Sequence, residues 1–255
     1  MNSLTGKVIV VTGGGRGLGA ATVRRLAEMG ARVVAGDVRK DWVDAVSDRA
    51  RASGGQVTGV GVDVTDEAGV AALFDIAIER YGDLYGLVNA AAVLTARRLE
   101  DLELAEWDRV LGVNATGVFL CCRRAVREFR RQGSGGVIVN IGSISAIVGL
   151  PEQPAYCASK GAVLQLSRQI ATDYASYGIR CNVVGPGSIA GEFLDGYLGG
   201  QPDPAAAKNA ILAAHPVGRF ASADDIVAPV LFLLSEEAGF ITGANLQADG
   251  GYTAI

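Results

Sequence analysis

The chain alternates between short, almost purely apolar runs and longer stretches in which apolar positions recur every three or four residues. The short runs predict strands, and several lack the polar–apolar alternation of a half-exposed strand, which is typical of strands covered on both faces. The predicted strands are Lys7–Thr12, Arg32–Asp37, Val57–Val62, Leu84–Asn89, Gly136–Ile141, Arg180–Val184 and Asn245–Ala248.

The stretches between these runs have the periodicity of helices. After Thr65-Asp66, a suitable N-cap, apolar side chains recur at helical spacing as far as Gly82. Two longer helical patterns cover about Ala105–Arg131 and Ala155–Tyr177. Strands that alternate with helices predict an α/β fold of the Rossmann type, a doubly wound parallel sheet of about seven strands with helices on both faces. We expect a single domain over residues 1–255.

Composition narrows the function classes. The chain has 255 residues, with 23 basic and 27 acidic side chains and no dense basic block, which argues against a nucleic-acid partner. No leader is apparent, and no apolar run reaches the roughly 18 residues of a membrane span. The four cysteines lack C-x-x-C spacing and there is one histidine. We therefore expect reduced thiols, no metal site and a cytoplasmic protein.

The first strand continues into a glycine-rich turn, Thr12-Gly13-Gly14-Gly15-Arg16-Gly17-Leu18-Gly19, followed by a helical pattern. Glycines at such a turn let the backbone approach a pyrophosphate, whose charge then meets the amides of the helix N-terminus. A tight structural turn would explain a lone glycine-rich segment equally well.

An acidic residue at the end of the second strand strengthens the dinucleotide interpretation. Asp37 stands 18 residues after Gly19, where a carboxylate holds the adenosine ribose and repels a 2′-phosphate. Arg16 and Arg39 favour the opposite choice, because either could bind a 2′-phosphate. We give Asp37 more weight and predict NAD, with NADP as the less favoured cofactor.

Two further motifs stand where predicted strands end. Asp63-Val64 follows the third strand, and Asn89-Ala90-Ala91-Ala92 ends the fourth. Ligands bind at the carboxyl ends of the strands in open α/β sheets. A strand-end cap would explain either motif alone, whereas together with the glycine turn they indicate a dinucleotide.

A candidate acid/base pair lies further along the chain. Ser143 follows the fifth strand, and Tyr156 and Lys160 form an i, i+4 pair on one face of the next helix. The phenol has a reference pKa of about 10. A neighbouring ammonium and the positive charge of a nicotinamide would lower that pKa. An ordinary amphipathic helix face would explain the Tyr-x-x-x-Lys spacing by itself.

Together, these motifs resemble the short-chain dehydrogenase/reductase family along the whole chain. Thr12-Gly13-x-x-x-Gly17-x-Gly19 is similar to the family's cofactor loop, and Pro186-Gly187-Ser188-Ile189 to the loop at its nicotinamide site. The triad of the family is matched by Ser143, Tyr156 and Lys160, and its fourth catalytic residue by Asn114.

The resemblance implies three sets of site residues. The catalytic residues would be Asn114, Ser143, Tyr156 and Lys160. The cofactor-binding residues would be Thr12, Gly13, Arg16, Gly17, Leu18, Gly19, Asp37, Asp63, Val64, Asn89, Ala91, Tyr156, Lys160, Pro186, Gly187 and Ile189. The substrate would meet Ser143, Ser145, Tyr156 and Phe193.

The activity implied is hydride transfer between a nicotinamide cofactor and a secondary alcohol or ketone. The resemblance implies that Tyr156, as phenolate, takes the alcohol proton while Ser143 steadies the oxygen. It implies that Lys160 holds the nicotinamide ribose and keeps Tyr156 acidic, and that Asn114 passes the proton outward through a water.

One segment departs from the family pattern. Many members carry a threonine shortly after the Pro-Gly, where this chain has Ala190-Gly191-Glu192, so Ile189 or Glu192 would have to anchor the carboxamide. Residues from about 190 to 215 are expected to form a lid over the substrate. Their apolar side chains predict a neutral, fairly apolar substrate that is cyclic, steroid-like or sugar-like.

Other interpretations stay open at this point. A ketoreductase of the 3-oxoacyl-(carrier protein) type, using NADPH, is the alternative inside the family. A non-catalytic dinucleotide-binding protein is the alternative outside it, because a fold does not establish a function. The resemblance also implies a homotetramer or a homodimer.

Overall fold

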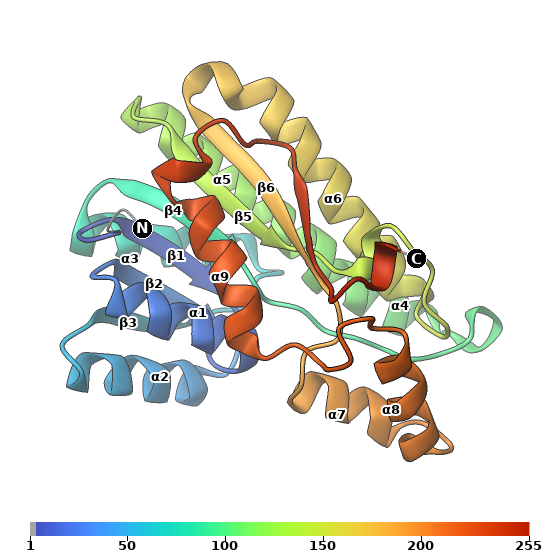
Figure 1. Ribbon diagram of the computed structural model, residues 1–255. Helices are drawn as coiled ribbons and strands as arrows, with labels where there is room; N and C mark the ends of the chain where they lie inside the picture. The colour runs from blue at the N-terminus through green and yellow to red at the C-terminus, as the bar shows by residue number, and fades with distance from the viewer. Residues whose placement is uncertain (1–3, 255) are drawn as a thin grey trace.

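The seven predicted strands form one parallel sheet in the order β3-β2-β1-β4-β5-β6-β7 (Figure 1). The computed structural model describes residues 4–254, so residues 1–3 and 255 of the predicted domain lie outside the described part. The strands are β1 Val8–Thr12, β2 Arg32–Asp37, β3 Gln56–Gly61, β4 Leu84–Asn89, β5 Gly136–Ile141, β6 Ile179–Pro186 and β7 Asn245–Ala248. The predicted single-domain α/β fold is confirmed.

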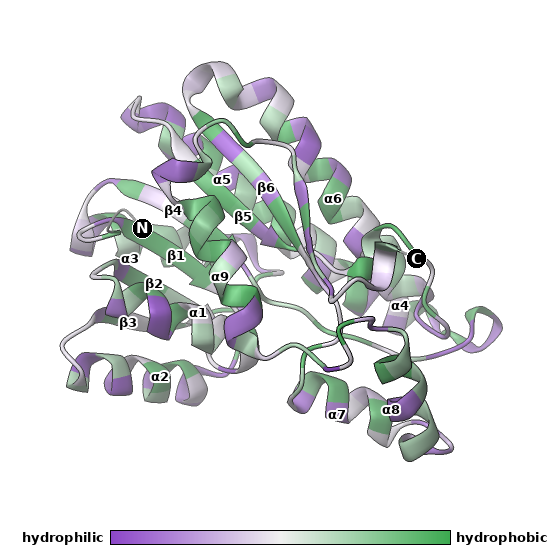
Figure 2. Ribbon diagram, viewed as in Figure 1, coloured by the Kyte–Doolittle hydropathy of each residue, from purple (hydrophilic) through white to green (hydrophobic). Residues whose placement is uncertain are grey.

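Helices cover both faces of this sheet because successive strand residues point to opposite sides. Ile9 and Val11 belong to one apolar cluster, whereas Val8 and Val10 belong to the other. The first cluster includes α1 (Gly17–Glu28), α2 (Lys40–Ala52) and α9 (Ala223–Leu234). The second includes α3 (Glu67–Tyr81), α5 (Val118–Gln132) and α6 (Pro154–Tyr174). Figure 2 shows the strands between these two layers as the most hydrophobic part of the molecule.

The chain order of the strands reverses between β1 and β4, which are neighbours in the sheet. The connection after β1 leads to α1 on one face of the sheet, and the connection after β4 leads to α5 on the other face. This divergence opens a crevice at the carboxyl ends of the two strands. The helices α7 (Glu192–Gly199) and α8 (Pro204–Ala213) follow β6 and lie apart from both helical layers (Figure 1). The segment predicted as a lid thus contains two short helices beside the crevice.

Helix α3 begins where the sequence predicts. The Asp66 carboxylate accepts hydrogen bonds from the backbone N–H groups of Ala68 and Gly69, and Gly82 ends the helix with a φ of 91°. The predicted N-cap and the predicted end are both confirmed. Backbone donors at a helix start have no partner inside the helix, so a carboxylate there stabilises the helix.

The long helix predicted over Ala105–Arg131 is interrupted. It consists of α4 (Leu104–Leu111), a π-helical segment Gly112–Gly117, and α5. Within that segment, Asn114 is fully buried, accepts a hydrogen bond from Val93 N at 2.8 Å and donates one to Val93 O at 2.9 Å. The wider turn thus coincides with a residue that is bound to the segment after β4, and local π-helical turns of this kind are frequent at functional sites.

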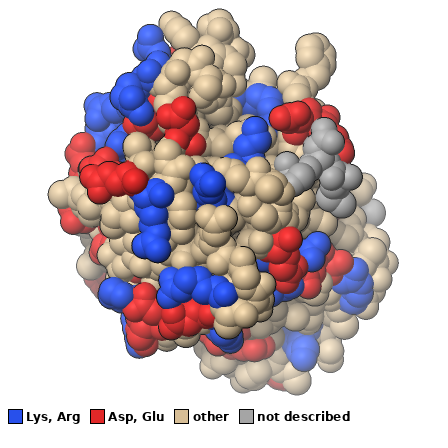
Figure 3. Space-filling view, turned by 90° about the vertical axis from the view of Figure 1, so that its left-hand side faces the viewer, with Lys and Arg blue, Asp and Glu red and all other residues tan. Residues whose placement is uncertain are grey.

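The surface carries charges of both signs. On the face in Figure 3, basic and acidic side chains are interspersed. Many form exposed ion pairs, among them Arg24 with Asp224 and Lys40 with Asp44. Within residues 4–254, no helix has the length and apolar character needed to cross a bilayer.

One ionic cluster on α5 is partly buried. Glu128 is 3% exposed and accepts hydrogen bonds from Arg124 at 3.0 Å and from Arg131 at 2.9 Å. Burial alone would raise the pKa of Glu128, but the hydrogen bonds from Arg131 and Arg124 outweigh it and hold the pKa below its usual value.

We predict that Glu128→Gln lowers the free energy of unfolding by about 2 kcal/mol at neutral pH, because it leaves two arginines without their buried carboxylate. The pKa is lower in the folded state, so this contribution is complete at neutral pH and is lost as the pH falls through the folded pKa. Urea unfolding at about pH 7 and about pH 4 tests both statements. Glu67→Gln, which removes the exposed partner of Arg123, is the control and should change stability little. A pH-independent loss for Glu128→Gln would contradict the prediction.

Candidate active site

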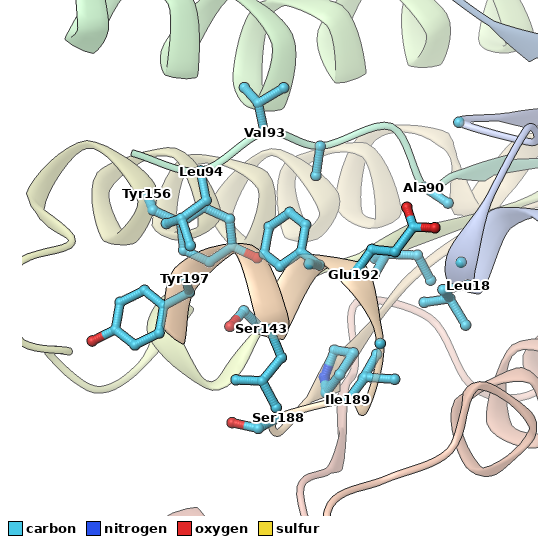
Figure 4. Close-up of a pocket in the computed structure, with 18 of the residues that line it drawn as sticks. Leu18, Ala90, Val93, Leu94, Ser143, Tyr156, Ser188, Ile189, Glu192 and Tyr197 are labelled. Atoms are coloured by element: carbon cyan, nitrogen blue, oxygen red, sulfur yellow. The ribbon is translucent and has the colours of Figure 1, made fainter. Parts of the chain in front are cut away.

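A single cavity of about 860 Å³ runs along the carboxyl ends of the strands, from the glycine turn to α8. Figure 4 shows Leu18 and Ala90 at one end and Tyr156 and Tyr197 toward the other. Most of the predicted site residues line this cavity: Gly13, Arg16, Gly17, Leu18, Gly19, Asp37, Asp63, Val64, Ala91, Ser143, Tyr156, Lys160, Pro186, Gly187, Ile189 and Phe193. Thr12, Asn89, Asn114 and Ser145 do not line it.

The turn after β1 packs against the segment after β4 so closely that side chains are excluded. A Cβ atom on Gly13 would lie 2.7 Å from both N and Cα of Ala91, and the φ of Gly13 is 66°. A Cβ atom on Gly19 would lie 1.9 Å from Gly13 O. The glycines therefore bring bare backbone to the cavity at the start of α1, and this cradle fits the pyrophosphate of a dinucleotide.

A fixed carboxylate stands at the end of β2. Asp37 is 9% exposed, and its two oxygens accept hydrogen bonds from Gly15 N at 2.9 Å and from Arg39 N at 3.0 Å. Because both bonds come from the backbone, the carboxylate is held at the cavity wall before any ligand arrives. This geometry suits recognition of ribose hydroxyls.

Both arginines that could bind a 2′-phosphate have carboxylate partners. The Arg16 guanidinium lies 4.6 Å from the centroid of the Trp42 ring and bonds Glu192 at 3.1 Å. Arg39 lies equally far from that ring and pairs with Asp41 at 2.9 Å. Glu192, a predicted substitute for the missing threonine, is thus engaged with the glycine turn. No motif in the sequence pointed to Trp42, although it lines the cavity.

Thr12 and Asn89, two of the predicted site residues that do not line the cavity, belong to a buried chain of hydrogen bonds. Asn89 lies 3.5 Å from Thr12 Oγ1 and donates to Asn140 Oδ1 at 2.8 Å. Asn140 donates in turn to Ser167 Oγ at 2.8 Å. The chain joins the ends of β1, β4 and β5 to α6, so Thr12 and Asn89 hold the strands in place rather than face the cavity.

Asn114 and Ser145, the other two predicted site residues that do not line the cavity, are buried near the catalytic candidates. Asn114 donates to Ser159 Oγ at 3.1 Å, and Ser159 donates to Tyr156 O at 2.8 Å. Both amide protons of Asn114 are therefore used, on Val93 and Ser159. The Ser145 backbone N–H donates to Ser143 Oγ at 3.1 Å, whereas its own hydroxyl is buried without a partner among the described residues. The predicted substrate contact of Ser145 is not supported, because its side chain does not reach the cavity.

Tyr156 and Lys160 lie on the same face of α6, as the spacing predicts. Lys160 Nζ is 5.5 Å from the centroid of the Tyr156 ring and donates to Ile141 O at 2.8 Å. Both residues are buried, at 9% and 2% exposed. Burial lowers the pKa of Lys160 to about 8.

In the protein alone, the pKa of Tyr156 is raised, so Lys160 by itself does not produce the expected lowering; the effect of the nicotinamide charge stays a prediction. Burial raises the pKa of Tyr156 to about 12, and the hydrogen bond to the Ser143 hydroxyl offsets only part of this effect. The same low-polarity surroundings that disfavour the phenolate also disfavour the Lys160 ammonium, which limits what the lysine can contribute. A positive charge bound in the cavity would lower this pKa.

Sequence reasoning missed one polar residue at the substrate end. Gln153 lines the cavity and is 9% exposed. It precedes Tyr156 by three positions, so the helical spacing that identified Lys160 could also have identified it.

His215 serves a structural purpose. Its Nε2 accepts a hydrogen bond from Ser188 N at 3.0 Å, and its Nδ1 lies 2.7 Å from Ile211 O. The neutral ring, protonated on Nδ1, satisfies both contacts. Among residues 4–254, no group of three His, Cys, Asp or Glu side chains could hold a metal ion.

Known proteins resemble this chain along nearly its whole length. A family model described as enoyl-(acyl carrier protein) reductase matches residues 5–253. The chain is 38% identical over 254 residues to 2-(S)-hydroxypropyl-CoM dehydrogenase 3 of Xanthobacter autotrophicus, covering 100% of this chain and 99% of the relative. It is 41% identical over 250 residues to cis-4-hydroxycyclohexanecarboxylate dehydrogenase of Sinomonas cyclohexanicum, covering 98% and 97%. The crystal structure of a short-chain type dehydrogenase/reductase from Mycobacterium marinum matches with a TM-score of 0.93 and 30% identity, over 99% of this chain and 98% of that chain.

The pKa of Tyr156 can be tested without a substrate. We predict that the ultraviolet titration curves of the wild type and Tyr156→Phe superimpose up to about pH 11, because the buried phenol with its pKa of about 12 stays protonated there. An ordinary tyrosine would already contribute its phenolate absorbance near pH 10. Divergence of the two curves near pH 10 would show that burial does not control this pKa.

Proposed function

This chain belongs to the short-chain dehydrogenase/reductase family, and we propose that it oxidises a neutral, fairly apolar secondary alcohol with NAD. The chain is an oxidoreductase that acts on CH–OH groups and transfers a hydride between a nicotinamide cofactor and a secondary alcohol or ketone. The observation that supports the proposal most is the placement of Tyr156. Its buried phenol stands beside Ser143 and Lys160 in a cavity that also contains the glycine turn and Asp37.

The part of the cavity that begins at the glycine turn would hold the cofactor. At one end, the backbone of Gly13–Gly19 would hold the pyrophosphate, Asp37 the adenosine ribose, and Asp63-Val64 the adenine edge. Pro186, Gly187 and Ile189 would hold the nicotinamide. When bound, the nicotinamide supplies the acceptor for the hydride of the carbinol carbon.

The residues of α6 handle the proton that leaves the alcohol. Tyr156 in its phenolate form takes this proton, and the Ser143 hydroxyl donates a hydrogen bond to the same oxygen as carbonyl character develops. The Lys160 ammonium, held by Ile141 O at 2.8 Å, favours the phenolate electrostatically. Because oxidation needs the phenolate and reduction needs the phenol, the rate of oxidation rises with pH and the rate of reduction falls.

Asn114 acts through other residues in this scheme. Its amide ties Val93, which lines the cavity, to Ser159, which bonds the carbonyl of Tyr156. This arrangement makes Asn114 a positioning residue for Tyr156. The predicted water that passes the proton outward stays a prediction.

The choice of NAD rests on the charges around the adenosine end. Asp37 would repel a 2′-phosphate, and the compensating cations are engaged: Arg16 with Glu192 and Arg39 with Asp41. A 2′-phosphate would have to displace an existing partner from each arginine while it faces the Asp37 carboxylate. This balance favours NAD over NADP.

The other end of the cavity indicates the substrate. Its wall is formed mainly by apolar and aromatic side chains, including Leu94, Leu150, Phe193 and Leu194. The only basic residues along the described cavity are Arg16, which is paired with Glu192, and Lys160, which is bound to Ile141 O. An anionic group on the substrate would find no free cation, so a neutral substrate is favoured. One example is a cyclic alcohol that lacks a carboxylate, unlike the hydroxycyclohexanecarboxylate in the name of the Sinomonas relative. The apolar substrate end and the preference of the cofactor end for NAD both argue against the reduction of a carrier-tethered 3-oxoacyl substrate with NADPH.

Residues 190–215 would act as a lid over this end. Gly191 precedes α7 with a φ of 135°, a conformation that other residues rarely adopt, and α7 and α8 both line the cavity. A change in backbone angles at Gly191 would move α7 relative to β6. The homotetramer or homodimer and the cytoplasmic location also remain predictions, and the 42% exposed Phe119 on α5 is compatible with an interface.

We predict that Tyr156→Phe lowers kcat by at least about a thousandfold with any alcohol that the wild type oxidises, since it removes the proton acceptor. NADH binding, measured by fluorescence titration, should be nearly unchanged. Tyr174→Phe, on the same helix but not lining the cavity, is the matched control and should keep the wild-type rate. A near-normal rate for Tyr156→Phe would exclude the assigned mechanism.

A second substitution tests the cofactor choice. We predict that Asp37→Ser lowers kcat/KM for NAD about tenfold and raises it for NADP, because the variant loses a ribose acceptor and a repulsive charge. Steady-state kinetics with both cofactors measures the ratio. Asp41→Asn, which removes a carboxylate from Arg39 but not from the cavity wall, separates the effect of Asp37 from that of freeing an arginine. An unchanged NAD/NADP ratio in Asp37→Ser would refute this assignment.

A further inference from the structure

An amide side chain without a partner faces the substrate end of the cavity. Gln153 is 9% exposed and lines the cavity just before α6. Its backbone carbonyl accepts a hydrogen bond from Cys157 N at 2.9 Å, but within residues 4–254 its side-chain amide makes none. Unlike the Ser145 hydroxyl, this amide is not among the buried polar groups sealed away from solvent. The amide is therefore open to the cavity, and no described protein group competes with a ligand for its hydrogen bonds.

The amide stands close to the reacting group. Gln153 is the N-cap of α6 and precedes Tyr156, which lies in the first turn of that helix, by three residues. Leu94, Leu150, Pro151 and Phe193, which line the same cavity, are apolar. A hydrogen bond formed there is shielded from water, which makes its loss more costly than at the surface.

Other polar groups on the same wall differ in burial. The hydroxyls of Tyr197, Tyr252 and Ser188 also line the cavity. Each of these three residues is half-buried, whereas Gln153 is 9% exposed. Gln153 is the neutral side chain at this end that combines deep burial with an unused hydrogen-bonding group.

We propose that Gln153 is a specificity-determining residue that hydrogen-bonds a second oxygen of the substrate. The inference rests on the proposed function and narrows its substrate class to neutral diols and hydroxyketones. An amide both donates and accepts, so it matches a hydroxyl or a carbonyl without requiring a charge. Because Gln153 stands three residues before Tyr156, the second oxygen would lie within one ring of the carbon that Tyr156 serves.

The test compares two substrates that differ only in the second oxygen. Cyclohexanol and cis-cyclohexane-1,2-diol are oxidised with NAD by the full-length wild type and by Gln153→Leu, which has similar size and no amide. We expect Gln153→Leu to lower kcat/KM for the diol about tenfold or more, mainly through KM, and to change that for cyclohexanol by less than about threefold. Gln153→Met serves as the second variant if the leucine disturbs folding.

Gln169→Leu is the matched control, since Gln169 lies on the same helix, is exposed and bonds Asp173 rather than the cavity. It should leave both substrates unchanged. An equal loss for both substrates in Gln153→Leu, or an unchanged ratio, overturns the proposal.

Binding of the diol to the protein–NADH complex, measured by calorimetry, separates this inference from the proposed function. If the wild type oxidises neither alcohol, the proposed function fails. Calorimetry then still decides the question of Gln153: weaker diol binding in Gln153→Leu supports the assignment, and equal binding overturns it.

Discussion

The contact between the turn after β1 and the segment after β4 constrains the whole site. At Gly13 the two backbones approach so closely that a Cβ atom would lie 2.7 Å from Ala91. This contact exists because β1 and β4 are neighbours in the sheet although two strands lie between them in the sequence. It fixes where the crevice begins and brings bare backbone to one end of the cavity. A side chain at Gly13 would push apart the two segments that form the cofactor end.

Burial is the second physical factor, and it acts on both catalytic candidates at once. It raises the pKa of Tyr156 to about 12 and lowers that of Lys160 to about 8, since each shift disfavours the charged form. Near pH 7, the protein alone therefore holds Tyr156 as the neutral phenol and Lys160 mainly as the ammonium. In the proposed mechanism, a positive charge bound beside Tyr156 would favour its phenolate, so proton transfer would depend on the bound cofactor.

In the proposed function, the two ends of the cavity would use different interactions to select their ligands. The cofactor end relies on backbone amides and the fixed Asp37 carboxylate, with nearby cations already neutralised by Glu192 and Asp41. The substrate end relies on an apolar wall with one buried, unpaired amide at Gln153. On this proposal, charge would discriminate at the cofactor end, while shape and a single neutral hydrogen-bonding group would discriminate at the substrate end.

The sequence by itself determined the sheet, because apolar runs and capping residues such as Asp66 act locally, and every predicted strand lies within two residues of its observed position. It also determined which helix carries Tyr156 and Lys160, since their spacing is a property of one helix. Only the tertiary structure decided which predicted residues reach the cavity: Asn89 and Asn114 are consumed by hydrogen bonds to residues 51 and 21 positions away. It alone decided the direction of the Tyr156 pKa shift and the pairing of Arg16 with Glu192, 176 positions apart. Burial and long-range pairing depend on how distant segments pack, and no local pattern encodes them.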